Sequence, residues 1–80
     1  MAPLKTRTVP AISKAFGILE RIAESSAGLT LPELIHWSGL PKSSVHYLLV
    51  TLVRCGYVQR DSGTGRYVIG QKILKMGRPS

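Results

Sequence analysis

Hydroxyl, imidazole, phenol and ammonium side chains gather in the middle of this chain, where residues 34–60 contain no Asp or Glu. The residues that carry these groups are Lys42, Ser43, Ser44, His46 and Tyr47. Such groups can bind phosphate oxygens and the base edges exposed in the DNA major groove. The composition of this stretch therefore predicts a surface for a polyanion, provided that one element presents the side chains together.

The same stretch has the apolar spacing of an amphipathic helix. Apolar residues recur at i, i+3, i+4, i+7 and i+8: Val45, Leu48, Leu49, Leu52 and Val53. This spacing gives one stripe for a core. Ser43, Tyr47, Val50 and Arg54 point nearly opposite, with Thr51 beside them. We expect a helix over residues 42–55 that buries one side and presents the other to DNA.

Two helices are expected before it. From Ala11 onward a helical stripe is formed by Ile12, Ala15, Phe16, Leu19, Ile22 and Ala23. Gly28 follows as a stop signal. Leu29-Thr30 can form a very short extended segment, and Thr30 with Glu33 matches a capping box at the start of a second, short helix. Residues 38–40 break that helix, so two helices joined by a glycine-containing turn predict a helix-turn-helix.

A β-hairpin is expected after it, because residues 57–60 and 66–69 are rich in β-branched and aromatic side chains and flank a turn-forming loop at 61–65. The fold class is thus mainly α with a β-hairpin, a winged helix-turn-helix with a three-helix core and a two-stranded wing. We divide the chain into a flexible basic arm (1–10), the DNA-binding domain (11–70) and the start of a linker helix (71–80).

Charge favours nucleic acid over other partners. Eleven Lys and Arg against four Asp and Glu give a net charge of +7 in 80 residues, and neutralising phosphates releases condensed counterions. No catalytic constellation is visible, and His36 and His46 lack a third ligand for a metal. We expect no enzyme activity, no cofactor, no metal and no membrane span. The single cysteine fits a reduced, cytoplasmic location.

Eight residues are candidates for DNA contact: Thr30, Lys42, Ser43, Ser44, His46, Tyr47, Thr64 and Arg66. Ser43, Ser44 and Tyr47 would read bases with help from His46, and the others would hold phosphate or sugar. Simpler interpretations stay open: a solvated helix face with serine caps, a Thr30 that only caps, and a hairpin that only covers the core. A winged-helix protein-interaction module is the alternative function.

The motifs together resemble a known family. The runs 29–34, 38–46, 48–49 and 51–52, with the specific segment Gly39-Leu40-Pro41-Lys42-Ser43, are similar to the N-terminal winged helix of IclR-type bacterial transcriptional regulators. The hairpin residues Arg60-Asp61, Arg66-Tyr67 and Ile69-Gly70 resemble the wing of that family, and residues 72–77 the start of its linker helix.

The resemblance implies a homodimer that represses or activates at a pseudo-palindromic operator. It also implies a small-molecule effector bound by a C-terminal domain that these 80 residues do not supply. Three departures stand out. Tyr47 replaces a usual arginine, Ala11 stands where serine is common, and the loop 62–65 is slightly long.

Overall fold

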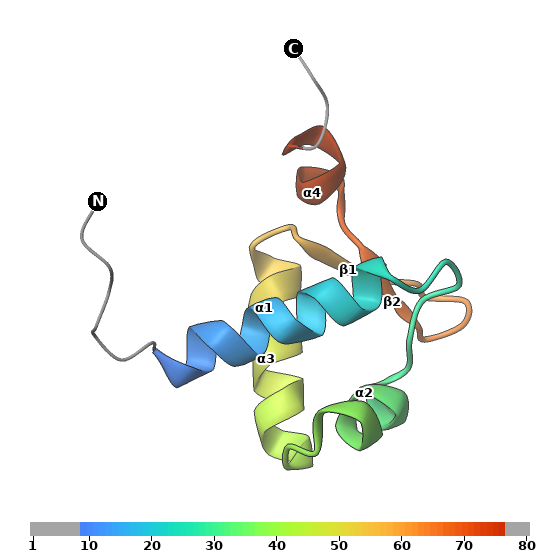
Figure 1. Ribbon diagram of the computed structural model, residues 1–80. Coiled ribbons are helices and arrows are strands. Elements are labelled where there is room, and N and C mark those ends of the chain that lie inside the picture. Colours follow the sequence, from blue (N-terminus) through green and yellow to red (C-terminus); the bar gives the residue numbers. More distant parts are fainter. Residues whose placement is uncertain (1–8, 77–80) are drawn as a thin grey trace, which may run out of the picture.

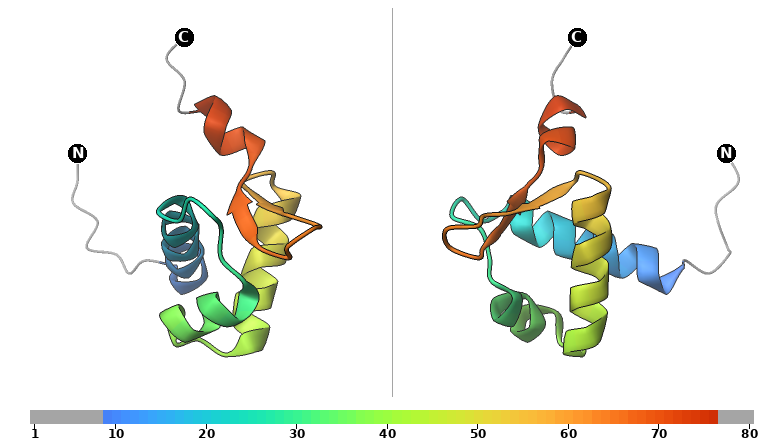
Figure 2. Two further views of the ribbon diagram at one scale, coloured as in Figure 1. Left: turned by 90° about the vertical axis from the view of Figure 1, so that its right-hand side faces the viewer. Right: turned by 180° about the vertical axis from the view of Figure 1, so that it is seen from behind.

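The computed structural model describes residues 9–76 and has the expected winged helix-turn-helix fold (Figure 1). Its elements in chain order are α1 (Pro10–Ala23), α2 (Leu31–Ser38), α3 (Lys42–Arg54), β1 (Val58–Arg60), β2 (Tyr67–Ile69) and α4 (Gln71–Met76). In Figure 1, α1 crosses in front of α3, and α2 lies beside the end where α3 begins. The two strands lie toward the other end of α3, and α4 leads away from them, as the views in Figure 2 also show.

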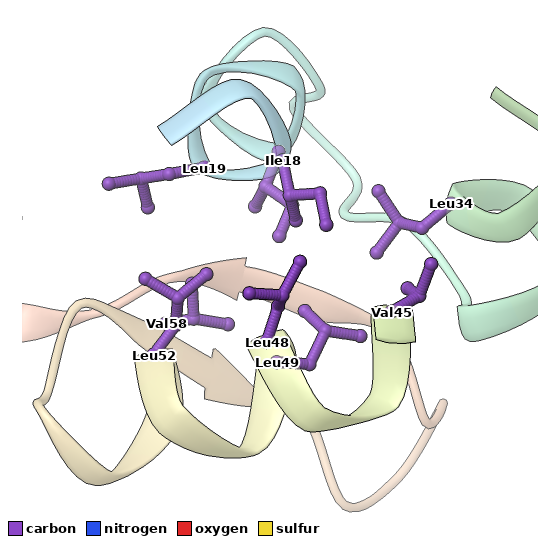
Figure 3. Packing of buried hydrophobic residues seen from close by; sticks show 9 residues of the cluster. Ile18, Leu19, Leu34, Val45, Leu48, Leu49, Leu52 and Val58 are labelled. Carbon is purple, nitrogen blue, oxygen red and sulfur yellow. The ribbon is translucent and has the colours of Figure 1, made fainter. Parts of the chain in front are cut away.

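One small apolar core joins α1, α2, α3 and β1 (Figure 3). Its buried members are Ile18, Leu19, Ile22, Leu34, Val45, Leu48, Leu49, Leu52 and Val58. Most of them come from α1 and α3, whose facing stripes interdigitate in the view of Figure 3. The core stripe of α3 is taken up by this packing, and polar residues on the first half of its other side remain exposed.

Two details of the expected core are wrong. Ile12 and Phe16 are 54% and 58% exposed, whereas Ile18, which the expected stripe left out, is 1% exposed. Apolar residues cover so much of the circumference of α1 that packing against α3 selects the buried side. Val53 is also exposed, at 38%, because it lies at the edge of the α3 stripe, where the core ends.

The starts of α1 and α3 both lack a side-chain cap. Val9 is the N-cap of α1, so the helix begins at Pro10, inside the segment expected to be an arm. The rest of that arm, residues 1–8, lies outside the described residues, as do residues 77–80 of the expected linker helix. Pro41 is the N-cap of α3, which ends at Arg54, one residue earlier than expected, with Cys55 as C-cap.

By contrast, α2 starts with the predicted capping box. The backbone N–H of Thr30 donates to Glu33 Oε1 at 2.8 Å, and the Glu33 N–H donates to Thr30 Oγ1 at 3.3 Å. Gly39 ends the helix in the left-handed conformation, with φ 71°, which glycine adopts without steric strain. The turn to α3 is therefore defined at both ends by local sequence.

The hairpin is antiparallel, with Val58 opposite Ile69 and Arg60 opposite Tyr67. It is joined to the start of α2 through Leu29, whose N–H donates to the Tyr67 carbonyl at 3.0 Å and whose carbonyl accepts from the Tyr67 N–H at 2.7 Å. Of the expected extended segment Leu29-Thr30, Leu29 forms this short bridge, and Thr30 is the N-cap of α2. Gly28 allows it, because a Cβ there would lie 2.7 Å from Val68 Cγ1.

Candidate nucleic-acid interface

Four exposed polar residues lie along the first half of α3 and form what we call the outer face: Lys42, Ser43, His46 and Tyr47. Tyr47 is the most prominent, with 69% of its surface exposed. Ser44 is half-buried, at the border between this face and the core stripe. Five of the eight predicted contact residues are therefore brought together on two turns of one helix.

The start of α3 adds backbone donors to this face. The Pro41 carbonyl accepts from the N–H groups of Ser44 and Val45, both at 3.1 Å, and no side chain caps the helix. The amides of Lys42 and Ser43 precede the first intrahelical hydrogen bonds and have no acceptor in the helix. Free first-turn amides and the positive end of the helix dipole both favour an anion.

Thr30 differs from these residues, because its hydroxyl is already engaged in the capping box. The hydrogen bond from its backbone N–H is the largest of the effects that hold the pKa of Glu33 below its ordinary value, and the Arg66 guanidinium contributes further. The capping box also uses the N–H groups of Thr30 and Glu33, and Pro32 has none, so the Leu31 N–H is the first-turn amide of α2 that remains for a phosphate.

Arg66 connects the hairpin with α2. Its Nη1 donates to the Gly28 carbonyl at 3.2 Å and to Glu33 Oε1 at 3.3 Å, and its side chain is 37% exposed. Glu33 lies 33 positions before Arg66 in the chain, so no local sequence pattern could indicate that these two residues pair. The guanidinium retains other N–H donors.

Thr64 is also used within the hairpin. Its hydroxyl donates to Asp61 Oδ2 at 2.7 Å and accepts from the Arg66 N–H at 3.2 Å. The hydrogen bond from Thr64, followed by that from the Gly63 N–H, lowers the pKa of Asp61. The loop is thus closed around its own carboxylate, and Thr64 presents less free hydrogen-bonding capacity than its sequence position suggests.

Two arginines that were not among the predicted contacts lie nearby. Arg54 and Arg60 line a pocket of about 240 Å³ between the second half of α3 and the hairpin, together with Val50, Val53 and Tyr67. We call these five residues the cleft. The position of Arg60 could have been found from the sequence. Side chains alternate along a strand, so Arg60 lies on the same side of β1 as the buried Val58.

Other kinds of site find no support in the part of the chain that the structure describes. Within residues 9–76 no three His, Cys, Asp or Glu side chains are grouped to hold a metal ion. Nor does any helix in that range have the length and apolar character needed to cross a membrane.

A family model described as the IclR helix-turn-helix domain matches residues 11–62, which include α2, α3, β1 and all of α1 except Pro10. Among curated proteins, the transcriptional repressor IclR of Escherichia coli is 35% identical over 72 residues, which is 90% of this chain and 26% of the repressor. The chain therefore spans about a quarter of the length of that relative.

Solved structures agree with this match. An IclR family transcriptional regulator from Brucella abortus superposes with a TM-score of 0.77 at 31% identity, over 96% of this chain and 30% of the other. The repressor BlcR of Agobacterium tumefaciens gives a TM-score of 0.74 at 35% identity, over 86% of this chain and 27% of the other. These relatives are named as transcriptional regulators, not as enzymes.

Proposed function

Since this chain belongs to the IclR family and is a helix-turn-helix DNA-binding domain, we propose that it reads an operator by inserting α3 into the major groove of double-stranded DNA. The observation that supports this most is the outer face of α3, which is polar, free of acids and exposed over the first half of the helix. A helix with these properties fits the major groove in size and in hydrogen-bonding character.

Within that face, Ser43, Ser44 and Tyr47 contact base edges, and His46 assists as a hydrogen-bond donor. Lys42 holds a phosphate at the start of the helix, where its charge adds to that of the free amides. Tyr47 offers an aromatic ring for a thymine methyl and a hydroxyl for a base edge or phosphate. The base preference of this protein at that position therefore differs from that of relatives with arginine.

The remaining predicted residues have supporting roles. Thr30 contributes by fixing the start of α2, where the Leu31 N–H is left for a phosphate, because both its own N–H and its side chain are engaged with Glu33. The hairpin lies along the backbone or the adjacent minor groove, where Thr64 and the free N–H groups of Arg66 contact phosphate or sugar. These contacts position the domain without reading sequence.

We also propose a homodimer that binds a pseudo-palindromic site. Val9, Ile12 and Phe16 leave 57%, 54% and 58% of their surface exposed along one side of α1, which suits burial against a second copy. In sedimentation experiments Phe16→Asp is expected to shift the protein toward monomer, whereas Lys14→Asp, an exposed position on another side of α1, is not. A Phe16→Asp variant that stays dimeric would contradict this surface.

Selection from a random duplex pool, followed by titration of the enriched sequence, tests DNA reading. We expect the enriched duplex to bind at least about a thousandfold more tightly than random DNA at physiological salt, as is typical of specific recognition. Equal affinity for both would exclude operator reading. Tight binding to a protein partner with little salt dependence would instead support a protein-interaction module.

Further properties belong to the longer regulators that this chain resembles. We propose a cytoplasmic location at the nucleoid, and control by a small-molecule effector that binds outside these 80 residues. The direction of control, repression or activation, follows from the position of the operator and not from this domain.

A further inference from the structure

We propose that the cleft between α3 and the hairpin is a phosphate subsite for duplex DNA. In it, Arg54 and Arg60 bind the sugar–phosphate strand that separates the major groove from the minor groove. The inference rests on the proposed DNA binding and assigns to this contact two residues other than the candidates considered so far. Its ligand class is the phosphate diester of duplex DNA.

The strand register places Arg60 at the cleft. Arg60 is directly opposite Tyr67 in the ladder, and directly opposed residues have their side chains on the same face of a sheet. Val58, two residues earlier, is buried in the core, so this face is the one turned toward α3. Arg60 lies just beyond the core edge, and its Nη2 passes 3.2 Å from the position that a Cβ on Gly65 would take.

Arg54 approaches from the other wall. It lies in the last turn of α3, two turns beyond Tyr47, and its side chain is exposed. Val50, which shares its side of the helix, and Val53 complete the helical wall of the cleft. An apolar floor with a guanidinium on each side excludes water from part of an anion while supplying charged donors.

The charges around the cleft favour an anion. Among the described residues, ion pairs within 4.0 Å are formed by Arg21 and Arg66, and neither Arg54 nor Arg60 takes part in one. The one acid nearby is Asp61, whose carboxylate accepts hydrogen bonds from Thr64 and Gly63 within the loop. The charge of Arg60 also helps to lower the pKa of Asp61, although the two side chains form no ion pair within 4.0 Å. In the described part of the chain, Arg66 uses its Nη1 for the Gly28 carbonyl and Glu33, whereas the side chains of Arg54 and Arg60 donate no hydrogen bond and keep all their donors for a ligand.

The position of the cleft matches the shape of DNA. A domain that places α3 in the major groove and the hairpin along the neighbouring minor groove must straddle the strand between these grooves. The cleft lies between the two elements that enter the grooves. Bidentate guanidinium contacts to that strand would set the depth and tilt of α3 without reading bases.

The test measures how binding to an operator-length duplex depends on salt, for the wild-type protein and for Arg54→Gln, Arg60→Gln and the double variant. Each single change is expected to reduce the slope of log K against log salt by about 0.9, and the double change by about 1.8. Both arginines are exposed, so the variants should keep the thermal midpoint of the wild type. The matched control is Lys75→Gln, which removes the same charge from the exposed side of α4.

A second measurement follows the arginine side chains directly. In ¹⁵N spectra, the Nε–H signals of Arg54 and Arg60, assigned through the Gln variants, are expected to shift when duplex is added, whereas that of Arg21 on α1 stays in place. An unchanged slope in the double variant, or an equal loss in the Lys75→Gln control, would overturn the subsite while DNA binding stands. If the wild-type protein shows no salt-dependent binding, the subsite and the proposed function both fail.

Discussion

The first half of α3 and the hairpin are both rich in polar side chains, but they use them in opposite ways. On α3, Lys42, Ser43 and Tyr47 extend from a helix that is anchored in the core by the buried residues of its other side. In the hairpin, Thr64 and Arg66 are engaged with Asp61, Gly28 and Glu33. The first half of α3 presents free side chains on a rigid helix. In the hairpin, the side chains form internal hydrogen bonds that hold the hairpin itself in place.

Under the proposed function, this difference suits the two regions to separate tasks. Base reading needs side chains that can choose among donors and acceptors, and these are found on α3. Positioning needs a surface whose shape is already set, because ordering a loop on binding costs conformational entropy. The hairpin provides such a surface through its internal hydrogen bonds and its bridge to Leu29.

The largest effect on stability is expected from a change in the core residues that hold α3 in place. Leu49 is fully buried beneath this helix, and Leu49→Ala should lower the free energy of unfolding by about 2–5 kcal/mol, because it leaves a cavity in a small core. Urea denaturation measures the change. A decrease in the free energy of unfolding below about 0.5 kcal/mol would mean that α3 does not depend on this core. The description of α3 as a rigid support would then be wrong.

The second largest effect is expected at Gly28, where the chain approaches the hairpin closely. At Gly28, with φ 86°, a Cβ would clash with Val68 Cγ1 and with the Tyr67 carbonyl oxygen at 2.8 Å. We expect Gly28→Ala to destabilise the protein by about 1–3 kcal/mol, in the range of a strained backbone position. Denaturant midpoints give the value.

Gly39→Ala is the matched control for this prediction, because Gly39 also has a positive φ, 71°, but nothing within 4 Å of a Cβ. The difference between the two variants isolates the clash from the backbone strain. Equal losses would indicate that the bridge between Leu29 and the hairpin is not held tightly.

The free side chains of α3 should change specificity and leave stability intact. Tyr47→Ala is expected to alter discrimination at one base pair by about 1–3 kcal/mol, with stability within about 0.5 kcal/mol of the wild type. Lys42→Ala should instead weaken all duplexes alike and flatten the salt slope by about one unit. Binding to a panel of singly substituted duplexes distinguishes the two; identical profiles would remove the division between reading and positioning on α3.

The smallest effect concerns the carboxylate that α2 shares with the hairpin. The folded pKa of Glu33 lies below its ordinary value of 4.5, so its stabilising effect is present above that value and is lost as the pH falls through the folded pKa. Glu33→Gln should reduce the fall in thermal midpoint between neutral and acidic pH. Glu20→Gln, an exposed acid on α1, serves as the control and should behave as the wild type.

Local chemistry explains what could be predicted from sequence. The capping box at Thr30 and Glu33, the stop at Gly39 and the period of α3 each depend on residues within a few positions of one another, and all three are present in the structure. Five of the candidate contacts followed from the period of α3 alone, because a helix places them side by side.

The features that could not be predicted from the sequence depend on contacts between segments far apart in the chain. The rotation of α1 is selected by packing on α3, so the spacing of its apolar residues predicts neither the burial of Ile18 nor the exposure of Phe16. The pairing of Arg66 with Glu33 and the meeting of Arg54 with Arg60 both depend on how the hairpin folds back over the helices. Neither can be inferred from spacing along the chain.

The open start of α3 has a consequence for how the protein moves. At the start of α2 the capping box closes the first turn, but behind Pro41 no side chain does so. The amides of Lys42 and Ser43 should therefore exchange with solvent faster than those of the α2 first turn. A bound phosphate would supply the missing acceptors, so DNA would complete the fold of the helix that reads it.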